Sequence, residues 1–461
     1  MAVTGGIMVP HPPLIIPEVG RGRESCIQET IDACTEAGAF VRALAPETVV
    51  IVSPHSIMYS DYIHISPGES ASGSFRDFGA GGVGFHERYD REFADLLAAR
   101  AEKAGIPAGT SGEQKKELDH GTMIPLWFIR RAPADFRIVR IGISGLPLSV
   151  HYRLGIEIQK TAEALGRRVV FVASGDLSHK LKKEGPYGFD PDGPVYDRKI
   201  MEVMGSGEFD RLLDFDEVFC EKAAECGHRS FVMMAGALDG KALEIRTLSH
   251  QDVTGVGYGV CTFRVTGEDA GRNFLAKWYD RRRAALDSKK AAEDPYVKLA
   301  RASIETYIRT GKRLRIPKGL PEDLTDRRAG VFVSLHLEGQ LRGCIGTIRP
   351  VCGSVAEEIV QNAVSAAVHD PRFRPVSEGE LDRLEYSVDV LGPTEPVHSP
   401  EELDVKRYGV VVSSGGRRGL LLPNLDGVDT VRQQIAIARQ KAGIAPYEDV
   451  ELERFEVVRH V

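Results

Sequence analysis

The chain has 461 residues, of which 42% are hydrophobic and 27% are charged, and its formal net charge at pH 7 is -7. This length predicts two or three domains, and the acidic balance argues against a general nucleic-acid binder, which would carry a basic face. The apolar start of the chain is broken by prolines and lacks a basic segment, and no apolar run reaches spanning length. We therefore expect neither a signal peptide nor a membrane segment.

The seven cysteines are scattered along the chain and include no Cys-x-x-Cys pair. This pattern argues against a disulfide framework and against a structural zinc site. It is typical of a reducing compartment, so we expect a cytoplasmic protein.

The first part of the chain alternates strand-like and helix-like stretches. Amphipathic patterns predict helices over Arg91–Lys103 and Ser149–Leu165, whereas the Gly- and Ser-rich run Gly68–Gly84 predicts a long flexible loop. Strands alternating with helices predict an α/β domain, with a mostly parallel sheet and helices on both faces. The predicted strands are Gly5–Val9, Thr48–Val52, Arg137–Ile143, Arg168–Ala173, Leu243–Leu248 and Gly257–Val265.

The strand pattern of the first part ends after Val265, and a strongly charged stretch follows. We predict a first domain over residues 1–268, a charged connecting helix over 269–292 and a second domain over 293–461.

The second part pairs strands through short turns and adds separate helices, which predicts an α+β domain. Its first two strands are joined at Glu338-Gly339, a good hairpin turn. The predicted strands are Gly330–Leu337, Gln340–Ile348, Leu384–Leu391, Gly409–Ser413 and Gly419–Leu422, and the predicted helices are Pro295–Thr310, Val355–Val368 and Val428–Ala442.

Two histidines follow strand-like runs, each directly behind a proline. They are His11 and His55. Neutral imidazole is the commonest metal ligand, and the proline stiffens the backbone that leaves the strand. Each histidine taken singly is more typical of a buried, hydrogen-bonded residue. Because loops at the carboxyl ends of parallel strands build active sites, the two together predict a metal site.

The third ligand is expected in Ala-Glu-Cys-Gly-His-Arg, residues 224–229, at the start of an apolar helix. With Glu225 the site would be a 2-His-1-carboxylate triad suited to Fe(II) and oxygen chemistry, whereas Cys226 would favour zinc or copper. In the alternative interpretation, Glu225 is an N-terminal helix charge and Cys226 a small packed hydrophobe.

Two further histidines are candidates for proton transfer. His179 is separated from its strand by Ser-Gly-Asp-Leu-Ser, which predicts a general acid or base. Asp176 and Ser178 would either orient it or cap a following helix. His120 precedes an apolar helix that Asp119 is expected to cap, with the imidazole facing the cleft.

Four motifs occur in a fixed order: His-Pro-Pro, Ser-Pro-His, Asp-His-Gly and Ser-Gly-Asp-Leu-Ser-His. Over roughly residues 5–266 the chain resembles the class III extradiol ring-cleavage dioxygenases of the LigB-like fold and the related Memo-type proteins. The resemblance implies Fe(II) held by His11, His55 and Glu225, with His179 as acid–base catalyst and His120 beside a catecholic substrate. The Cys-Gly that follows Glu225 resembles the Memo-type proteins, in which cysteine is the ligand.

The string Leu-Arg-Gly-Cys-Ile-Gly at residues 341–346 resembles the AMMECR-type domain, over roughly residues 293–461. That family has no assigned activity. Cys344 is either a thiolate activated by Arg342 or a buried strand cysteine. The fusion of the two modules resembles the AmmeMemoRadiSam system, which implies a radical S-adenosylmethionine protein and a Memo-like protein as partners.

Three functions are left open by these patterns. The first is an Fe(II)-dependent oxidoreductase acting on a small aromatic or other chelating substrate. The second is a Memo-like metal-binding protein without dioxygenase activity, and the third is a hydrolase with a zinc-bound water. We expect no nucleic-acid partner and no membrane partner.

Overall fold

The computed structural model describes residues 2–112, 117–425 and 427–461. The chain divides into two compact units, Met1–Asp280 and Arg281–Val461. The division lies inside helix α9 (Phe274–Ala292), in the segment assigned from the sequence to a connecting helix. Within the described residues, every helix is too short or too polar to cross a membrane.

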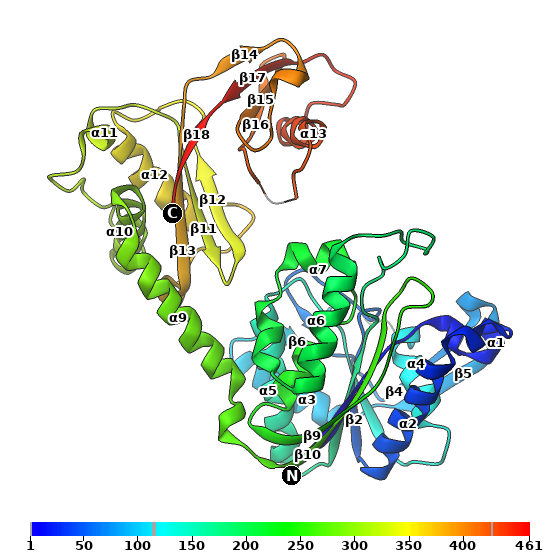
Figure 1. Cartoon of the computed structure of the whole chain (residues 1–461). Coiled ribbons are helices and arrows are strands. Elements are labelled where there is room, and N and C mark those ends of the chain that lie inside the picture. The colour runs from blue at the N-terminus through cyan, green and yellow to red at the C-terminus, as the bar shows by residue number, and fades with distance from the viewer. Residues whose placement is uncertain (1, 113–116, 426) are drawn as a thin grey trace. The chain divides into compact units, whose positions relative to one another are not determined.

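The first unit is built on a six-stranded sheet in the order β7-β2-β8-β1-β10-β9. Figure 1 labels β2, β9 and β10 of this sheet. The four strands at one side, β7, β2, β8 and β1, run parallel, and β10 is antiparallel to its two neighbours, β1 and β9. This arrangement confirms the predicted α/β class with a mostly parallel sheet. The strands are β1 (Val3–Val9), β2 (Thr48–Val52), β7 (Arg137–Ile141), β8 (Val169–Ser174), β9 (Lys241–Gln251) and β10 (Tyr258–Glu268).

Helices cover both faces of this sheet because its central strands are apolar on both sides. All five residues of β2 are buried, and alternate residues contribute to two separate hydrophobic cores. Helices α3, α5, α6, α7 and α8 contribute to one core, and α2 and α4 to the other. The helices are α1 (Pro17–Gly20), α2 (Gln28–Ala43), α3 (Arg91–Lys103), α4 (His120–Ile129), α5 (Leu148–Leu165), α6 (Asp192–Ser206), α7 (Glu217–Ala223) and α8 (His228–Ala237).

The prediction of a long flexible loop over Gly68–Gly84 is wrong. That run contains β4 (Ser70–Phe75) and the first half of β5 (Ala80–Arg88), which pair as an antiparallel ribbon. The buried side chain of Phe75 anchors the ribbon in the second core. Glycine and serine have low strand propensity, so the local pattern concealed the ribbon. A second short pair joins β3 (Ile63–His64) and β6 (Ala108–Gly109).

The second unit contains two antiparallel sheets, in the orders β12-β11-β13-β18 and β14-β17-β15-β16, which confirms the α+β class. Helices α10 and α12 pack on the first sheet, and α13 packs on the second. The helices are α10 (Pro295–Thr310), α11 (Glu322–Thr325), α12 (Val355–Val368) and α13 (Val431–Ala442). The strands are β11 (Val331–Leu337), β12 (Gln340–Gly346), β13 (Leu384–Leu391), β14 (Glu395–Val397), β15 (Gly409–Ser414), β16 (Arg417–Leu421), β17 (Glu451–Phe455) and β18 (Val457–His460).

The predicted hairpin between β11 and β12 is confirmed. Glu338 and Gly339 join the strands, and both have positive φ angles, 56° and 85°. A two-residue turn needs this left-handed backbone to match the twist of the paired strands.

Candidate metal site

Loops from neighbouring strands meet at the carboxyl edge of the parallel sheet. His11 follows β1, His55 follows β2, and Asp176 follows β8. These strands are neighbours in the order β2-β8-β1, so their loops leave the sheet side by side. The segment between α7 and α8 adds Cys226 to this edge.

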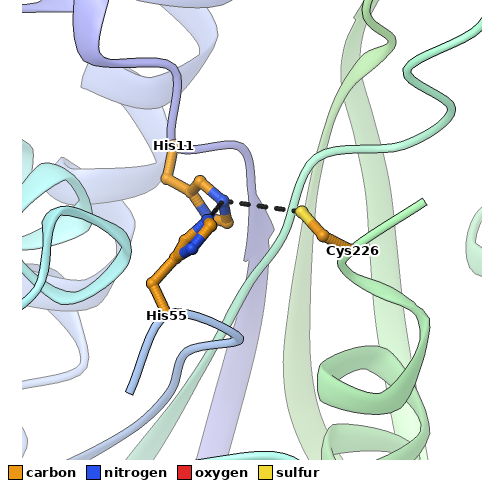
Figure 2. A group of neighbouring side chains, drawn as sticks. All are labelled: His11, His55 and Cys226. Atoms are coloured by element: carbon orange, nitrogen blue, oxygen red, sulfur yellow. Dashed lines mark hydrogen bonds between the residues drawn. The ribbon is translucent and has the colours of Figure 1, made fainter. Parts of the chain in front are cut away.

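The structure brings His11, His55 and Cys226 together. One ligand atom from each residue lies within 4.8 Å of the other two. The two Nε2 atoms of the histidines are 3.0 Å apart, and the Cys226 Sγ atom is 3.6 Å from Nε2 of His11. Figure 2 shows these side chains pointing toward one another. Two imidazoles and one thiolate are a donor set for a borderline or soft metal ion.

The three donors differ in exposure. His11 is buried, Cys226 is half-buried and His55 is exposed. Burial and the neighbouring His55 lower the pKa of His11 well below its ordinary value, so its imidazole is neutral at pH 7. A neutral imidazole is the form that binds metal. The exposed side, at His55, leaves room for ligands that the protein does not supply.

A hydrogen-bond chain fixes the tautomer of His11. The Ser174 hydroxyl donates to the carbonyl of Gly121 over 2.6 Å, and this uses its single proton. Ser174 Oγ, 2.9 Å from His11 Nδ1, therefore accepts a proton from that nitrogen. The other nitrogen, Nε2, keeps its lone pair and faces the Cys226 and His55 side chains.

Asp176 connects two of the proposed donors. Its carboxylate accepts a hydrogen bond from the backbone N–H of His11 over 2.8 Å. Its own backbone N–H points at the Cys226 Sγ atom over 3.3 Å. Of the two roles expected for Asp176, that of a helix cap is wrong, because the next helix, α6, begins only at Asp192. The structure assigns it to the loops that carry His11 and Cys226.

Glu225 lies outside the group of three, so Cys226 is the residue of the pair that completes it among the described residues. One Glu225 carboxylate oxygen accepts a hydrogen bond from the backbone N–H of His228 over 2.6 Å, at the start of α8. Burial raises the pKa of Glu225 to about 7. This placement matches the alternative of an N-terminal helix charge, and the geometry favours Cys226 over Glu225 as the third donor.

His120 lies beside the two histidine donors. Its ring centroid is 4.0 Å from that of His55 and 5.4 Å from that of His11. Burial and the two neighbouring imidazoles lower the pKa of His120 to about 3, so this side chain is neutral at pH 7. Asp119 caps α4 by accepting the backbone N–H of Thr122, as predicted.

Asp119 also ties the His55 loop to α4. The Ser53 hydroxyl donates to Asp119 over 2.5 Å and accepts the backbone N–H of His55 over 3.2 Å. Burial opposes ionisation of Asp119, but the hydrogen bonds from Ser53 and Thr122 and the charge of Arg140 prevail and lower its pKa. A buried carboxylate therefore holds the loop that presents His55.

His179 is held by the same segment that supplies Cys226. Its Nδ1 atom is 2.6 Å from the carbonyl oxygen of Ala224. A carbonyl only accepts, so Nδ1 carries the proton and Nε2 has a lone pair for proton exchange. The ring packs edge-on against Tyr187, with centroids 5.0 Å apart. This tautomer suits a general base.

Each of the two units matches the model of a known protein family. Residues 5–261 match the family model for the catalytic LigB subunit of aromatic ring-opening dioxygenase. The chain belongs to the LigB family. Residues 297–460 match the AMMECR1 family model, so the two modules are fused as the motifs predicted.

Relatives from several organisms resemble the LigB–AMMECR1 chain. A Clostridium acetobutylicum protein is 41% identical over 468 residues, covering 100% of this chain and 99% of its own length. A Thermotoga maritima protein is 54% identical over 170 residues, which are 36% of this chain and 98% of that protein. The crystal structure of an uncharacterized Pyrococcus horikoshii protein is 35% identical, covers 36% of this chain and 88% of its own, and superposes with a TM-score of 0.34.

Several residues that shape the LigB site were missed from the sequence. Ser53 and Ser174 are the first residues of the Ser-Pro-His and Ser-Gly-Asp-Leu-Ser-His motifs, but the sequence did not indicate that their hydroxyls bond to Asp119 and His11. Gly175 and Gly227 let two loops touch, since a Cβ built on Gly175 would lie 2.1 Å from the Cα atom of Gly227. His228, the histidine of the segment 224–229, is buried and hydrogen-bonded to Tyr196 and to the Leu212 carbonyl.

Proposed function

We propose that the LigB unit is a metal-dependent oxidoreductase that acts on a small chelating substrate, with His11, His55 and Cys226 as the ligands. The observation that carries the proposal is the convergence of these three donors at the carboxyl edge of the sheet. Membership of the family named for the catalytic subunit of a ring-opening dioxygenase supports an oxygen-dependent reaction.

The donor set bears on the choice of metal. A thiolate with two imidazoles is softer than a 2-His-1-carboxylate triad, so copper and zinc compete with iron(II) more strongly here than they would with Glu225. A bound redox-active ion would supply activation of oxygen and of the substrate diol. The exposed position of His55 leaves the open side on which a substrate would approach.

The protein's own residues supply proton transfer and orientation. His179 Nε2 accepts a proton from the substrate hydroxyl, and its Nδ1–H remains bonded to the Ala224 carbonyl. Neutral His120 offers a hydrogen bond at the same edge. Asp176 and Ser174 hold the backbone and ring of His11 in place.

Metal analysis combined with oxygen uptake tests this proposal. Protein purified without oxygen is loaded with iron(II), copper or zinc and is given catechol, whose adjacent hydroxyls chelate, or resorcinol, whose separated hydroxyls do not. With iron(II) or copper, we expect oxygen consumption with catechol and not with resorcinol, and a rate lowered about 10²–10⁴-fold in His179→Gln with metal content unchanged. The zinc-loaded protein should consume no oxygen, because Zn²⁺ has no redox chemistry. Binding of iron(II) and copper without oxygen uptake for either ion would overturn the enzymatic assignment.

Cys226 also favours a second candidate, a metal-binding protein without ring-cleavage activity. The matched pair Cys226→Ser and Glu225→Gln separates the ligand sets. We expect Cys226→Ser to lose the metal and Glu225→Gln to retain it. Loss in Glu225→Gln and retention in Cys226→Ser would restore the carboxylate ligand predicted from the sequence.

A further inference from the structure

The second unit contains a cavity of about 1120 Å³. Its walls come from the face of β11, β12 and β13 opposite α10 and α12, from β16 and α13, and from the C-terminal part of α9. It lies wholly within residues of the second unit and is distinct from the metal site of the LigB unit.

Cys344 lines this cavity, and hydrogen bonds fix both its thiol and its backbone. It pairs with Ser334 across β12 and β11, and the Ser334 hydroxyl donates to Sγ over 3.2 Å. The Asp370 carboxylate accepts the Cys344 backbone N–H over 2.9 Å, and Arg372 donates to the Cys344 carbonyl over 3.1 Å. A thiol on such a rigid backbone has a fixed direction toward whatever occupies the cavity.

Arg342, which was considered as the residue that activates Cys344, forms an ion pair with Glu380 instead. Arg342 bonds to Glu380 through two of its nitrogens, at 2.7 and 3.3 Å. Burial raises the pKa of Cys344, whereas the Ser334 hydrogen bond and the charges of Arg372 and Lys441 oppose that rise. The cations that act on Cys344 therefore come from the loop after α12 and from α13.

The cavity has an excess of positive charge. Six basic side chains line it, Lys289, Lys290, Arg372, Arg418, Lys441 and Arg459, against the three side-chain carboxylates Glu293, Glu385 and Asp389. Each of these carboxylates is already paired, with Arg301, with Lys289 and Arg282, and with Arg459, respectively. Two of the six basic side chains pair with carboxylates outside this lining, Arg372 with Asp370 and Arg418 with Glu453. Lys441 has no such partner among the described residues. An anion is the ligand that this uncompensated charge would attract.

Part of the cavity wall is apolar. Phe332, Leu420 and Leu422 line it and pack in one hydrophobic cluster with Ile348 and Leu425. A purely inorganic anion would leave this wall uncovered. The combination of an apolar wall, an unpaired cation and a few placed polar groups is typical of a small-molecule site.

We propose that this cavity binds a small organic anion with an apolar tail, whose anionic group lies against Lys441 and Arg372 beside the Cys344 thiol. The tail lies along Phe332 and Leu420.

Alkylation of the full-length protein tests the charge preference with defined probes. Iodoacetate is an anion and iodoacetamide is neutral, and both transfer a carbon to the cysteine sulfur with loss of iodide and release of the thiol proton. We expect the iodoacetate-to-iodoacetamide rate ratio, measured by peptide mass spectrometry, to be at least about fivefold higher at Cys344 than at Cys352. Cys352 is an internal control because Glu357 and Glu358 act on it.

Substitution of the unpaired lysine gives the second part of the test. Lys441→Gln should bring the Cys344 ratio down to that of Cys352, and Lys441→Arg should keep it. Lys298→Gln, the same charge change on α10, is the matched control and should have no effect. Equal ratios at the two cysteines, or a ratio at Cys344 that Lys441→Gln leaves unchanged, would overturn the proposal.

Protection of Cys344 from alkylation by competing small molecules tests the role of the apolar wall. Sodium octanoate should slow alkylation of Cys344 and not of Cys352, whereas acetate and octan-1-ol at the same concentration should protect less. Equal protection by acetate would contradict the role of the apolar wall, and equal protection by octan-1-ol would contradict the preference for an anion.

Discussion

The Ser174 Oγ atom lies 2.9 Å from Nδ1 of His11, and the serine proton is already committed to the Gly121 carbonyl. This one contact decides which nitrogen of His11 has a lone pair for a metal. It also links the end of β8 to the loop after β1, so that neighbouring strands control a single ligand.

Replacing Ser174 tests this control. Ser174→Ala should lower metal affinity by about 10–100-fold, because removal of the partner that orients a ligating histidine has that effect in metal sites. Competition with a chelator of known affinity measures the change. Ser206→Ala, at the exposed end of α6, is the matched control, and an equal affinity in both variants would contradict the role of Ser174.

A substitution at Gly175 tests the close approach of the loop after β8 and the segment between α7 and α8. A Cβ at this position would lie 2.1 Å from the backbone of Gly227, so Gly175→Ala must push apart the segments that carry Asp176 and Cys226. We expect loss of metal binding with circular dichroism close to that of the unsubstituted protein. In Gly267→Ala the new Cβ has no neighbour within 4 Å, and this variant should bind metal normally.

Asp119 should contribute to stability as well as to the site. Asp119→Asn removes the countercharge near the buried Arg140 and weakens the bond to Ser53. Breaking a buried pair in this way should cost about 2–4 kcal/mol of unfolding free energy, measured by urea denaturation. Asp135→Asn, at an exposed pair with Arg88, should change little. Similar losses in both variants would argue against the buried network.

The Asp370–Arg372 pair predicts a pH dependence in the second unit. Burial opposes ionisation of Asp370, but hydrogen bonds from Arg372 and from the Cys344 backbone lower its pKa from 3.8 to about 2. A carboxylate with a depressed folded-state pKa stabilises the protein above its unfolded pKa, and this contribution is lost as the pH falls from about 4 to about 2.

Asp370→Asn should therefore destabilise the protein at pH 7 by about 1 kcal/mol, a modest value because the Arg372 side chain is 53% exposed and screened by solvent. The difference from the unsubstituted protein should shrink as the pH falls toward 2. Chemical denaturation across this range measures it, with Asp382→Asn as an exposed control. A difference that stays constant with pH would exclude the carboxylate charge as its cause.

The sequence predicted the parts of the site that local pattern controls. A proline and a histidine directly after a buried strand place His11 and His55 at one edge, because parallel strands all end there. The choice between Glu225 and Cys226 has a different origin. Ala224 adopts a left-handed backbone with φ 52°, which alanine rarely does, so the local sequence pattern does not predict the path of the chain into Glu225 and Cys226.

In the fold, too, elements with a strong local pattern were predicted and elements that depend on distant partners were not. Buried strands such as β2 are continuous apolar runs and were found, whereas β14, β17 and β18 were missed. β17 reads Glu-Leu-Glu-Arg-Phe and pairs with β14 and β15, which lie far from it in the chain. Strand formation there depends on partners more than on local composition.

The separation of the three donors along the chain has a consequence for folding. His11 and His55 are 44 positions apart, and His11 and Cys226 are 215 positions apart. An unfolded chain holds no such group, so an ion that binds it binds the assembled unit and shifts the folding equilibrium by mass action. The midpoint of thermal unfolding should therefore rise with metal concentration, and a fragment that ends before Cys226 would lose this response together with its third ligand.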